Sequence, residues 1–309
     1  MKKELMLMAL LGGSGLMSLA QPEKDSLQLI HLQEVQIVSS RATEKTPFSY
    51  SNMDKTEIET VNSGQDIPFL LTLTPSVVAT SDAGTGIGYT GFRVRGTDAN
   101  RINITANGIP MNDAESHGVF WVNMPDFASS LEDLQVQRGV GTSTNGAGAF
   151  GASVNMKTGY IPVNPYGEVS SSYGSFHSSK ATLKLGTGQL GNHWSFDARL
   201  SSIQSDGYID RAGVDLQSYF AQAGYCNENT LLKFILFGGK EKTYHAWDGV
   251  PKDSLNTRRS YNPSGYMGDD ANGQPLYYGN QTDNYVQTHY QVHLLHLINP
   301  FLKLNAALH

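Results

Sequence analysis

The sequence predicts an α+β domain followed by antiparallel strands of a transmembrane β-barrel, with only part of that barrel present. Between residues 46 and 159, short strand-like runs alternate with tight turns rich in Asn and Gly. From residue 160 onward, polar and apolar side chains alternate with the period of two that is typical of β-strands. No segment after the N-terminus has the run of about 20 apolar residues that a membrane-spanning helix needs.

The N-terminus has the parts of a secretory signal peptide. Lys2 and Lys3 form a basic region, residues 5–17 form an apolar region, and small residues follow at the cleavage positions. We therefore expect residues 1–20 to be removed before Gln21. An exported chain without a membrane helix is periplasmic, secreted or an outer-membrane barrel, and the 32 glycines and 15 tyrosines suit a barrel.

Charge and cysteine content narrow the function further. The net charge of −6 becomes −7 after cleavage, because Lys2, Lys3 and Glu4 together carry +1. This acidic balance argues against a nucleic-acid partner. Cys226 is the single cysteine, so it cannot form a disulfide within the chain, and we interpret it as a small hydrophobic residue.

The first half of the mature chain divides into a short segment and a domain. Residues 21–45 are largely polar and would form a periplasmic N-terminal segment. The domain spans residues 46–159. Asp66 precedes Ile67 and Pro68, a pattern typical of a helix start, and Pro75 would end that helix. A further short helix is expected near residues 125–131.

The second half, residues 160–309, alternates apolar and polar faces. Four apolar stripes are Trp194, Phe196, Ala198 and Leu200; Ala181, Leu183 and Leu185; Tyr219, Ala221, Ala223 and Tyr225; and Leu302, Leu304, Ala306 and Leu308. Such strands either cover a soluble core or face lipid outside and water inside. Short turns that alternate with one long polar connection favour the membrane barrel, although period two alone leaves a soluble β-sandwich open.

About seven strands are predicted in this half. Their expected ranges are 166–174, 179–187, 193–205, 216–227, 229–241, 285–298 and 300–309. Barrels of bacterial outer-membrane proteins have even strand numbers, and plugged transporters have 22 strands. We therefore expect the chain to hold the N-terminal part of a larger barrel.

The sequence contains short matches to nucleotide-binding and metal-binding motifs, but the segments around them do not have the secondary structure that such sites require. Two GxGxxG matches, at residues 86–91 and 146–151, are followed by strand-like runs, whereas a dinucleotide site needs a helix there. His289, His293 and His296 do not share one face of a strand, so a zinc site is not expected. The sequence predicts no metal site, no cofactor and no enzyme activity.

Four motifs in order resemble the plug domain of TonB-dependent outer-membrane receptors. The run from Val94 to Gly96 resembles their IRG element, and residues 107–113 (NGIPMND) resemble their DGIPLND-type turn. Residues 131–139 (LEDLQVQRG) resemble IERIEVLRGP, with Val140 in place of Pro, and residues 145–158 resemble YGSGAIGGVINIITK. The resemblance covers residues 33–160, and the second half fits the same family through its strand pattern.

The resemblance implies roles for three groups of residues. The strand-like run where the energy-coupling TonB box would lie consists of Glu34, Val35, Gln36, Ile37 and Val38. Two plug arginines that pair with barrel-wall glutamates in this family correspond to Arg95 and Arg138. The plug loops that would face the ligand contain Asp82, Tyr89, His117, Phe120 and Trp121.

The function implied is active import of a bulky, scarce nutrient, a ferric siderophore or ferric citrate, across the bacterial outer membrane. TonB, with its inner-membrane energising complex, would be the protein partner, and the barrel would contact outer-membrane lipid. The plug and N-terminal segment would be accessible from the periplasm. Two alternatives remain open from sequence: a passive outer-membrane porin or adhesin, and a secreted β-sandwich enzyme.

Overall fold

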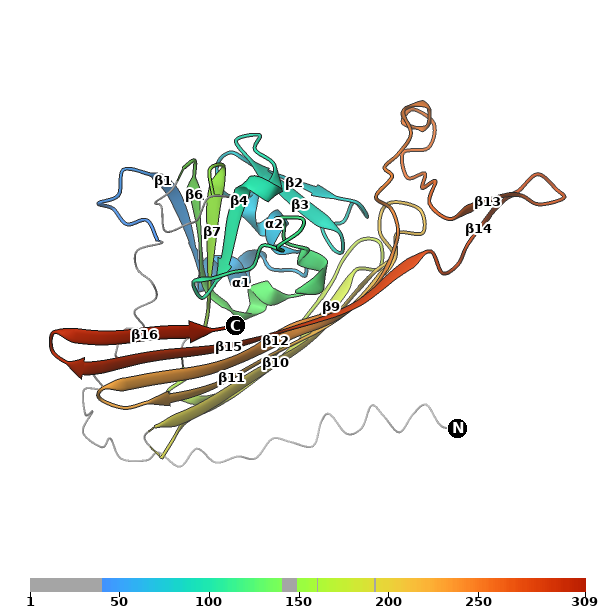
Figure 1. The fold of residues 1–309 in the computed structure, drawn as a ribbon. Helices are drawn as coiled ribbons and strands as arrows, with labels where there is room; N and C mark the ends of the chain where they lie inside the picture. Colours follow the sequence, from blue (N-terminus) through green and yellow to red (C-terminus); the bar gives the residue numbers. More distant parts are fainter. Residues whose placement is uncertain (1–40, 141–148, 160, 192) are drawn as a thin grey trace, which may run out of the picture. The chain divides into compact units, whose positions relative to one another are not determined.

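The computed structural model describes residues 41–140, 149–159, 161–191 and 193–309, which form an α+β domain and a long antiparallel sheet (Figure 1). The expected signal peptide and the run from Glu34 to Val38 lie outside the described residues. Within the described part of the chain, no helix has the length and apolar character to cross a membrane.

The α+β domain is built on a five-stranded sheet in the order β1-β6-β7-β4-β5. The pair β4–β7 is parallel and the other neighbours are antiparallel. A separate antiparallel pair, β2–β3, lies outside this sheet. The strands are β1 (Ser49–Asp54), β2 (Val77–Ser81), β3 (Thr90–Val94), β4 (Ile102–Ala106), β5 (Ile109–Pro110), β6 (Leu131–Arg138) and β7 (Ala152–Thr158).

The helices of this domain are short and begin where the sequence provides caps. In α1 (Lys55–Val61), Asp54 and Glu57 form a reciprocal capping box. The start of α2 (Ile67–Leu71) after Asp66 is confirmed, with Pro in its first turn, and the helix ends four residues before Pro75. The helix expected near residues 125–131 is the 3₁₀-helix η4 (Phe127–Ser130). The other 3₁₀-helices of the described residues are η2 (Ala99–Arg101) and η3 (Trp121–Asn123) in this domain and η6 (Lys252–Ser254) in the second half.

A hydrophobic core joins the five-stranded sheet to α1, α2, η3 and η4. Its fully buried members include Leu71, Val94, Ala106, Val136, Ala152 and Val154. Burying this apolar surface stabilises the domain by about 25 cal/mol per Å². The core therefore gives the loops of this domain a rigid support.

The second half is a seven-stranded antiparallel sheet in which each strand pairs with the next one in order. All seven predicted strands are present, and the long connection after β12 holds the small hairpin β13–β14 (Figure 1). The fold class predicted from the sequence is thus confirmed. The strands are β8 (Pro165–Tyr173), β9 (Ser179–Leu190), β10 (Trp194–Ser205), β11 (Val214–Cys226), β12 (Thr230–Tyr244), β13 (Tyr266–Asp269), β14 (Pro275–Tyr277), β15 (Thr282–Asn299) and β16 (Leu302–Leu308).

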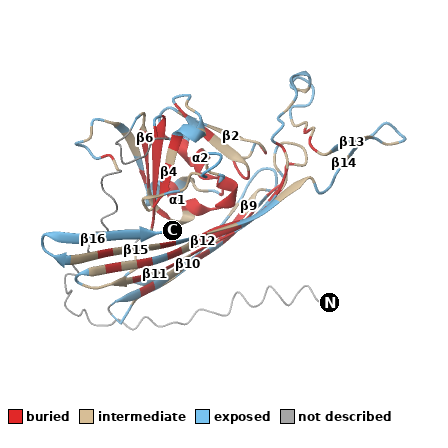
Figure 2. Ribbon diagram, in the orientation of Figure 1, coloured by how far each residue is buried: buried red, intermediate tan, exposed pale blue. Residues whose placement is uncertain are grey.

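Buried and exposed residues alternate along the strands of the long sheet (Figure 2), and in β9 and the first part of β10 the buried residues are polar and the exposed ones are largely apolar. In β11 and β12, by contrast, apolar residues such as Leu216 and Ile235 are buried. In β10, Ser195 and Arg199 are buried, whereas Phe196 and Leu200 are exposed, Leu200 by 60%. A soluble β-sandwich would bury the apolar face against a second sheet. This inverted burial is typical of strands whose outer face contacts lipid, and it argues against the sandwich alternative.

Candidate functional site

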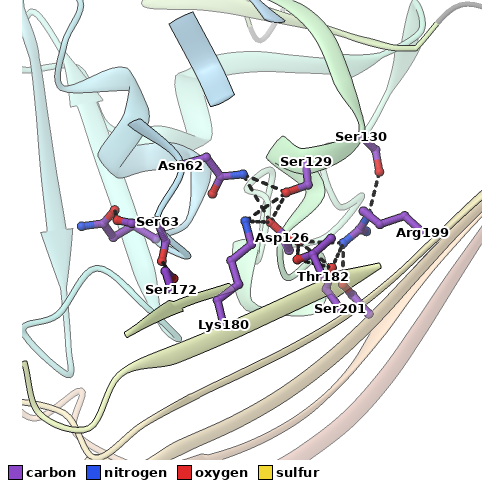
Figure 3. Close-up of polar contacts among 12 residues, drawn as sticks. Asn62, Ser63, Asp126, Ser129, Ser130, Ser172, Lys180, Thr182, Arg199 and Ser201 are labelled. Atoms are coloured by element: carbon purple, nitrogen blue, oxygen red, sulfur yellow. Dashed lines mark hydrogen bonds and ion pairs between the residues drawn. The ribbon is translucent and has the colours of Figure 1, made fainter. Parts of the chain in front are cut away.

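A buried carboxylate of the α+β domain lies between two cations of the long sheet. Asp126 adopts a left-handed backbone conformation (φ 52°) between η3 and η4. Its Oδ1 lies 2.6 Å from Nζ of Lys180 on β9, and its Oδ2 lies 3.2 Å from Nη1 of Arg199 on β10 (Figure 3). The three side chains are 0%, 6% and 3% exposed, so the ion pairs are almost completely desolvated.

Hydroxyl groups also donate hydrogen bonds to the carboxylate of Asp126. Ser129 donates to its Oδ1 at 2.6 Å, and Thr182 donates to its Oδ2 at 2.9 Å. Burial alone would raise the pKa of Asp126, but the charges of Arg199 and Lys180 outweigh burial and hold that pKa well below its usual value. Asp126 is therefore an anion at neutral pH.

The guanidinium of Arg199 donates hydrogen bonds both to the α+β domain and to the long sheet. Its Nε donates to Ser130 of the α+β domain at 2.8 Å, and its Nη1 donates to Ser201 and Ser218 of the long sheet at 2.7 and 3.0 Å. A buried ion pair needs such additional hydrogen bonds to offset its desolvation. This cluster was not predicted from the sequence, where Lys180 and Arg199 were recognisable only as polar residues opposite the apolar stripes of their strands.

Backbone also approaches backbone closely at this interface. Gly239 lies in β12, and a Cβ placed on it would lie 2.5 Å from Cδ of Pro125 and 3.2 Å from the carbonyl oxygen of Asn123. The same face of the sheet receives a side-chain hydrogen bond of 3.0 Å from Asn107 to Gln291 on β15. The α+β domain is thus held by charge, shape and hydrogen bonds.

The two arginines expected to pair with the wall, Arg95 and Arg138, lie near each other in the α+β domain. Arg138 donates to the hydroxyls of Ser49 and Ser51 and to the carbonyl of Tyr50, all on the neighbouring strand β1. Burial lowers the pKa of Arg138, and the nearby charge of Arg95 lowers it further. The described partners of Arg138 are therefore neutral oxygens of its own domain, and its pairing with wall glutamates stays a prediction.

A cavity of about 320 Å³ lies between the loops of the α+β domain and the ends of β12 and β15. The hydroxyl of Tyr89 donates to Asp283 at 2.5 Å and lies 3.5 Å from Glu241. Burial and these acidic neighbours raise the pKa of Tyr89. The lining residues are Tyr89, Met111, Asp113, Gly118, Val119, Phe120, Asn123, Met124, Glu241, Asp283, Tyr285, Gln287 and His289.

The structure brings together two of the five residues predicted to face the ligand. Tyr89 and Phe120 line the cavity. Asp82 lies outside it, half-buried, and its backbone N–H donates to the carbonyl of Tyr89. His117 occupies an exposed tight turn with φ 57°. Trp121 is 3% exposed and its ring packs on Phe92, so this residue belongs to the core of the domain.

Residues 42–153 match the family model of the TonB-dependent Receptor Plug Domain. Three solved structures of similar fold illustrate the match. The FpvA receptor of P. aeruginosa bound to heterologous pyoverdines is 14% identical, with a TM-score of 0.63 over 85% of this chain and 34% of that one. The siderophore receptor PiuA of Acinetobacter baumannii is 17% identical, with a TM-score of 0.62 over 87% of this chain and 36% of that one. The ferric-catecholate import receptor Fiu of E. coli K12 is 18% identical, with a TM-score of 0.61 over 82% of this chain and 37% of that one.

The chain therefore has the fold of a TonB-dependent receptor: a plug domain followed by strands of the barrel wall. It spans about a third of the length of these three receptors. No protein with curated annotation matches the sequence. Residues 42–153 are thus similar to the plug domain of a receptor, and the solved structures of similar fold are themselves receptors.

Proposed function

We propose that the receptor containing this chain imports a ferric siderophore or ferric citrate across the bacterial outer membrane. The observation that carries this proposal is a plug domain fixed to the inner face of wall strands by the buried Asp126 cluster. A passive porin needs no such domain inside its wall. The solved structures of similar fold include a siderophore receptor and a ferric-catecholate import receptor, which supports iron chelates as the class of ligand.

Opening a plug that is held by buried ion pairs needs an energy source, and the outer membrane has no ATP. The inner-membrane proton gradient supplies about 2.3 kcal/mol per charge for each 100 mV. We propose that TonB transmits this energy by binding the run Glu34–Val38 from the periplasmic side. An extended segment of this kind can add a strand to the sheet edge of a partner through main-chain hydrogen bonds.

A proline substitution tests this coupling segment. Ile37→Pro removes a backbone donor and should abolish uptake of the iron chelate, because strand addition depends on main-chain hydrogen bonds. Ile37→Ala keeps the donor and is the matched control, for which we expect most of the uptake to remain. Ligand binding to whole cells should be the same in both variants. Normal uptake by Ile37→Pro and by a deletion of the whole Glu34–Val38 run would exclude this segment as the TonB-binding site.

A further inference from the structure

We propose that a groove on the lipid-facing side of the wall binds a phosphorylated lipid of the outer leaflet, with an acyl chain in the groove and the phosphate at Lys240. The site lies on the outer face of the long sheet, so it does not depend on which ligand the receptor imports. It assigns one lipid class to one position of the apolar face described above.

The groove has a volume of about 580 Å³ and crosses the long sheet from β8 to β15. It runs between two rows of outward-facing side chains, each aligned across the sheet by the strand register. The first row consists of Val169, Leu183, Leu200 and Tyr219. The second row consists of Ser171, Ala181, Ser202, Gln217 and Lys240. Three side chains of the second row are small, so the surface is hollowed along it and Lys240 lies at one end of the hollow.

The outer face changes from apolar to polar at this groove. In the first row, Val169 and Leu200 are 80% and 60% exposed, as expected for side chains that contact lipid. In the next row on the far side of the groove, the register aligns five polar residues: Ser179, Gln204, Asp215, Lys242 and Asn284. The groove therefore follows the edge of the apolar band, where the head groups of membrane lipids begin.

The connections of β12 indicate which leaflet this edge faces. Lys240 lies four residues before the end of β12 at Tyr244, where the long connection that holds β13 and β14 begins. The other end of β12 follows a short turn at residues 227–229. In outer-membrane barrels the long loops are extracellular and the short turns are periplasmic. The ammonium of Lys240 therefore lies on the side of the outer leaflet.

The charge beside the groove is complementary to a phosphate. The neighbours of Lys240 in its row are Gln217 on β11 and Val286 on β15, and both are uncharged. Neither Lys240 nor Lys242 forms an ion pair within the described part of the chain, and Asp215 is aligned with Lys242 and not with Lys240. Two lysines and one carboxylate leave a net positive charge at the membrane surface, which attracts anionic lipid.

A matched pair of lipids tests the phosphate contact. Lipid A and its dephosphorylated form have the same acyl chains, and native mass spectrometry measures the binding of each to the whole receptor released from detergent. We expect lipid A to bind more tightly, and Lys240→Gln to reduce that preference about fivefold. Lys240→Arg keeps the charge and should keep the preference. Lys252→Gln, which removes a lysine of the long connection outside the groove, is the control and should also keep it.

A second substitution tests the groove itself. Ser202→Leu places a larger side chain in the hollowed row and should weaken the binding of both lipids without changing the preference between them. Equal binding of the two lipids by the natural protein, an unchanged preference in Lys240→Gln, or unchanged binding by Ser202→Leu would overturn the proposal. Phosphatidylglycerol that binds as tightly as lipid A would contradict the assignment to the outer leaflet. The measurement requires neither TonB nor an iron chelate, so its outcome is separate from that of the Ile37→Pro uptake experiment.

Discussion

Asp126 of the plug and Arg199 of wall strand β10 lie 3.2 Å apart, and Lys180 of β9 reaches the other oxygen of the same carboxylate at 2.6 Å. The carboxylate belongs to the plug and the cations to the wall, the opposite of the polarity that the family resemblance had suggested for Arg95 and Arg138. One plug side chain therefore forms buried ion pairs with two wall strands.

Removing Asp126 should weaken the attachment of the plug strongly. Asp126→Ala leaves Lys180 and Arg199 buried without a counter-charge, and loss of one partner of a buried pair costs about 3 to 5 kcal/mol. Calorimetric unfolding of the whole receptor measures this loss. Glu168→Gln is the control: Glu168 pairs with Lys184 at 3.2 Å but is 46% exposed, so we expect a loss of at most about 1 kcal/mol. Equal losses in the two variants would contradict the assigned importance of Asp126.

The stability of the plug should fall as the pH rises from about 4 to 8 because of Asp66. Burial raises the pKa of this carboxyl to about 8, and its Oδ1 has no hydrogen-bond partner in the described residues. The folded state therefore holds the proton more tightly than the unfolded chain, whose pKa is about 3.9. This contribution is complete below pH 4 and is lost as the pH rises through 8.

Asp66→Asn should flatten this part of the pH profile, and the variant should be more stable than the natural protein at pH 9. Unfolding temperatures at pH 5, 7 and 9 provide the measurement. Asp98→Asn, which changes an exposed carboxylate, serves as the matched control and should leave the profile unchanged. Parallel profiles for Asp66→Asn and the natural protein would show that Asp66 is not the responsible group.

The plug should need a glycine at position 239 to pack closely against β12. In Gly239→Ala the new methyl group would lie 2.5 Å from Cδ of Pro125, closer than carbon atoms approach without a shift of the backbone. We expect faster proteolysis of the plug in this variant, measured on the folded receptor. Gly174→Ala places a methyl group where no atom lies within 4 Å, and its proteolysis rate should remain that of the natural protein. Unchanged proteolysis of Gly239→Ala would mean that the contact is not needed.

The exposed apolar face should be sensitive to charge wherever it contacts lipid. Leu200→Arg places a charge on the outer face of β10, which costs about 2 to 4 kcal/mol near the middle of a bilayer. Folding of the whole receptor into lipid vesicles measures this cost. Leu255 is also exposed but follows η6 in the long connection, so Leu255→Arg should have little effect. A comparable loss at both positions would argue against lipid contact at Leu200.

Much of the fold followed from local patterns in the sequence. The strand predicted at residues 193–205 is β10 (Trp194–Ser205), because apolar and polar side chains alternate from Trp194 to Ser201. The start of α2 was equally predictable from Asp66 and the proline that follows Ile67. These signals are local, so a single sequence contains them.

The contacts between the plug and the wall could not be predicted in the same way. Asp126 meets Lys180 and Arg199 from 54 and 73 positions away, and no local pattern specifies which carboxylate will meet which cation. Tertiary packing also explains the position of Trp121. This residue was expected in a loop that faces the ligand, but its ring packs on Phe92 and is buried. Partners of this kind are fixed by tertiary packing.

The most direct test of energised import is the accumulation of iron-55 by iron-starved cells that produce the whole receptor, with and without TonB. Ferric citrate, a ferric hydroxamate and a ferric catecholate are supplied separately, and binding is measured on the same cells without energy. We predict that at least one chelate accumulates inside cells only when TonB is present, while its binding to the cell surface is equal in both strains. Accumulation that is equal with and without TonB would contradict the account.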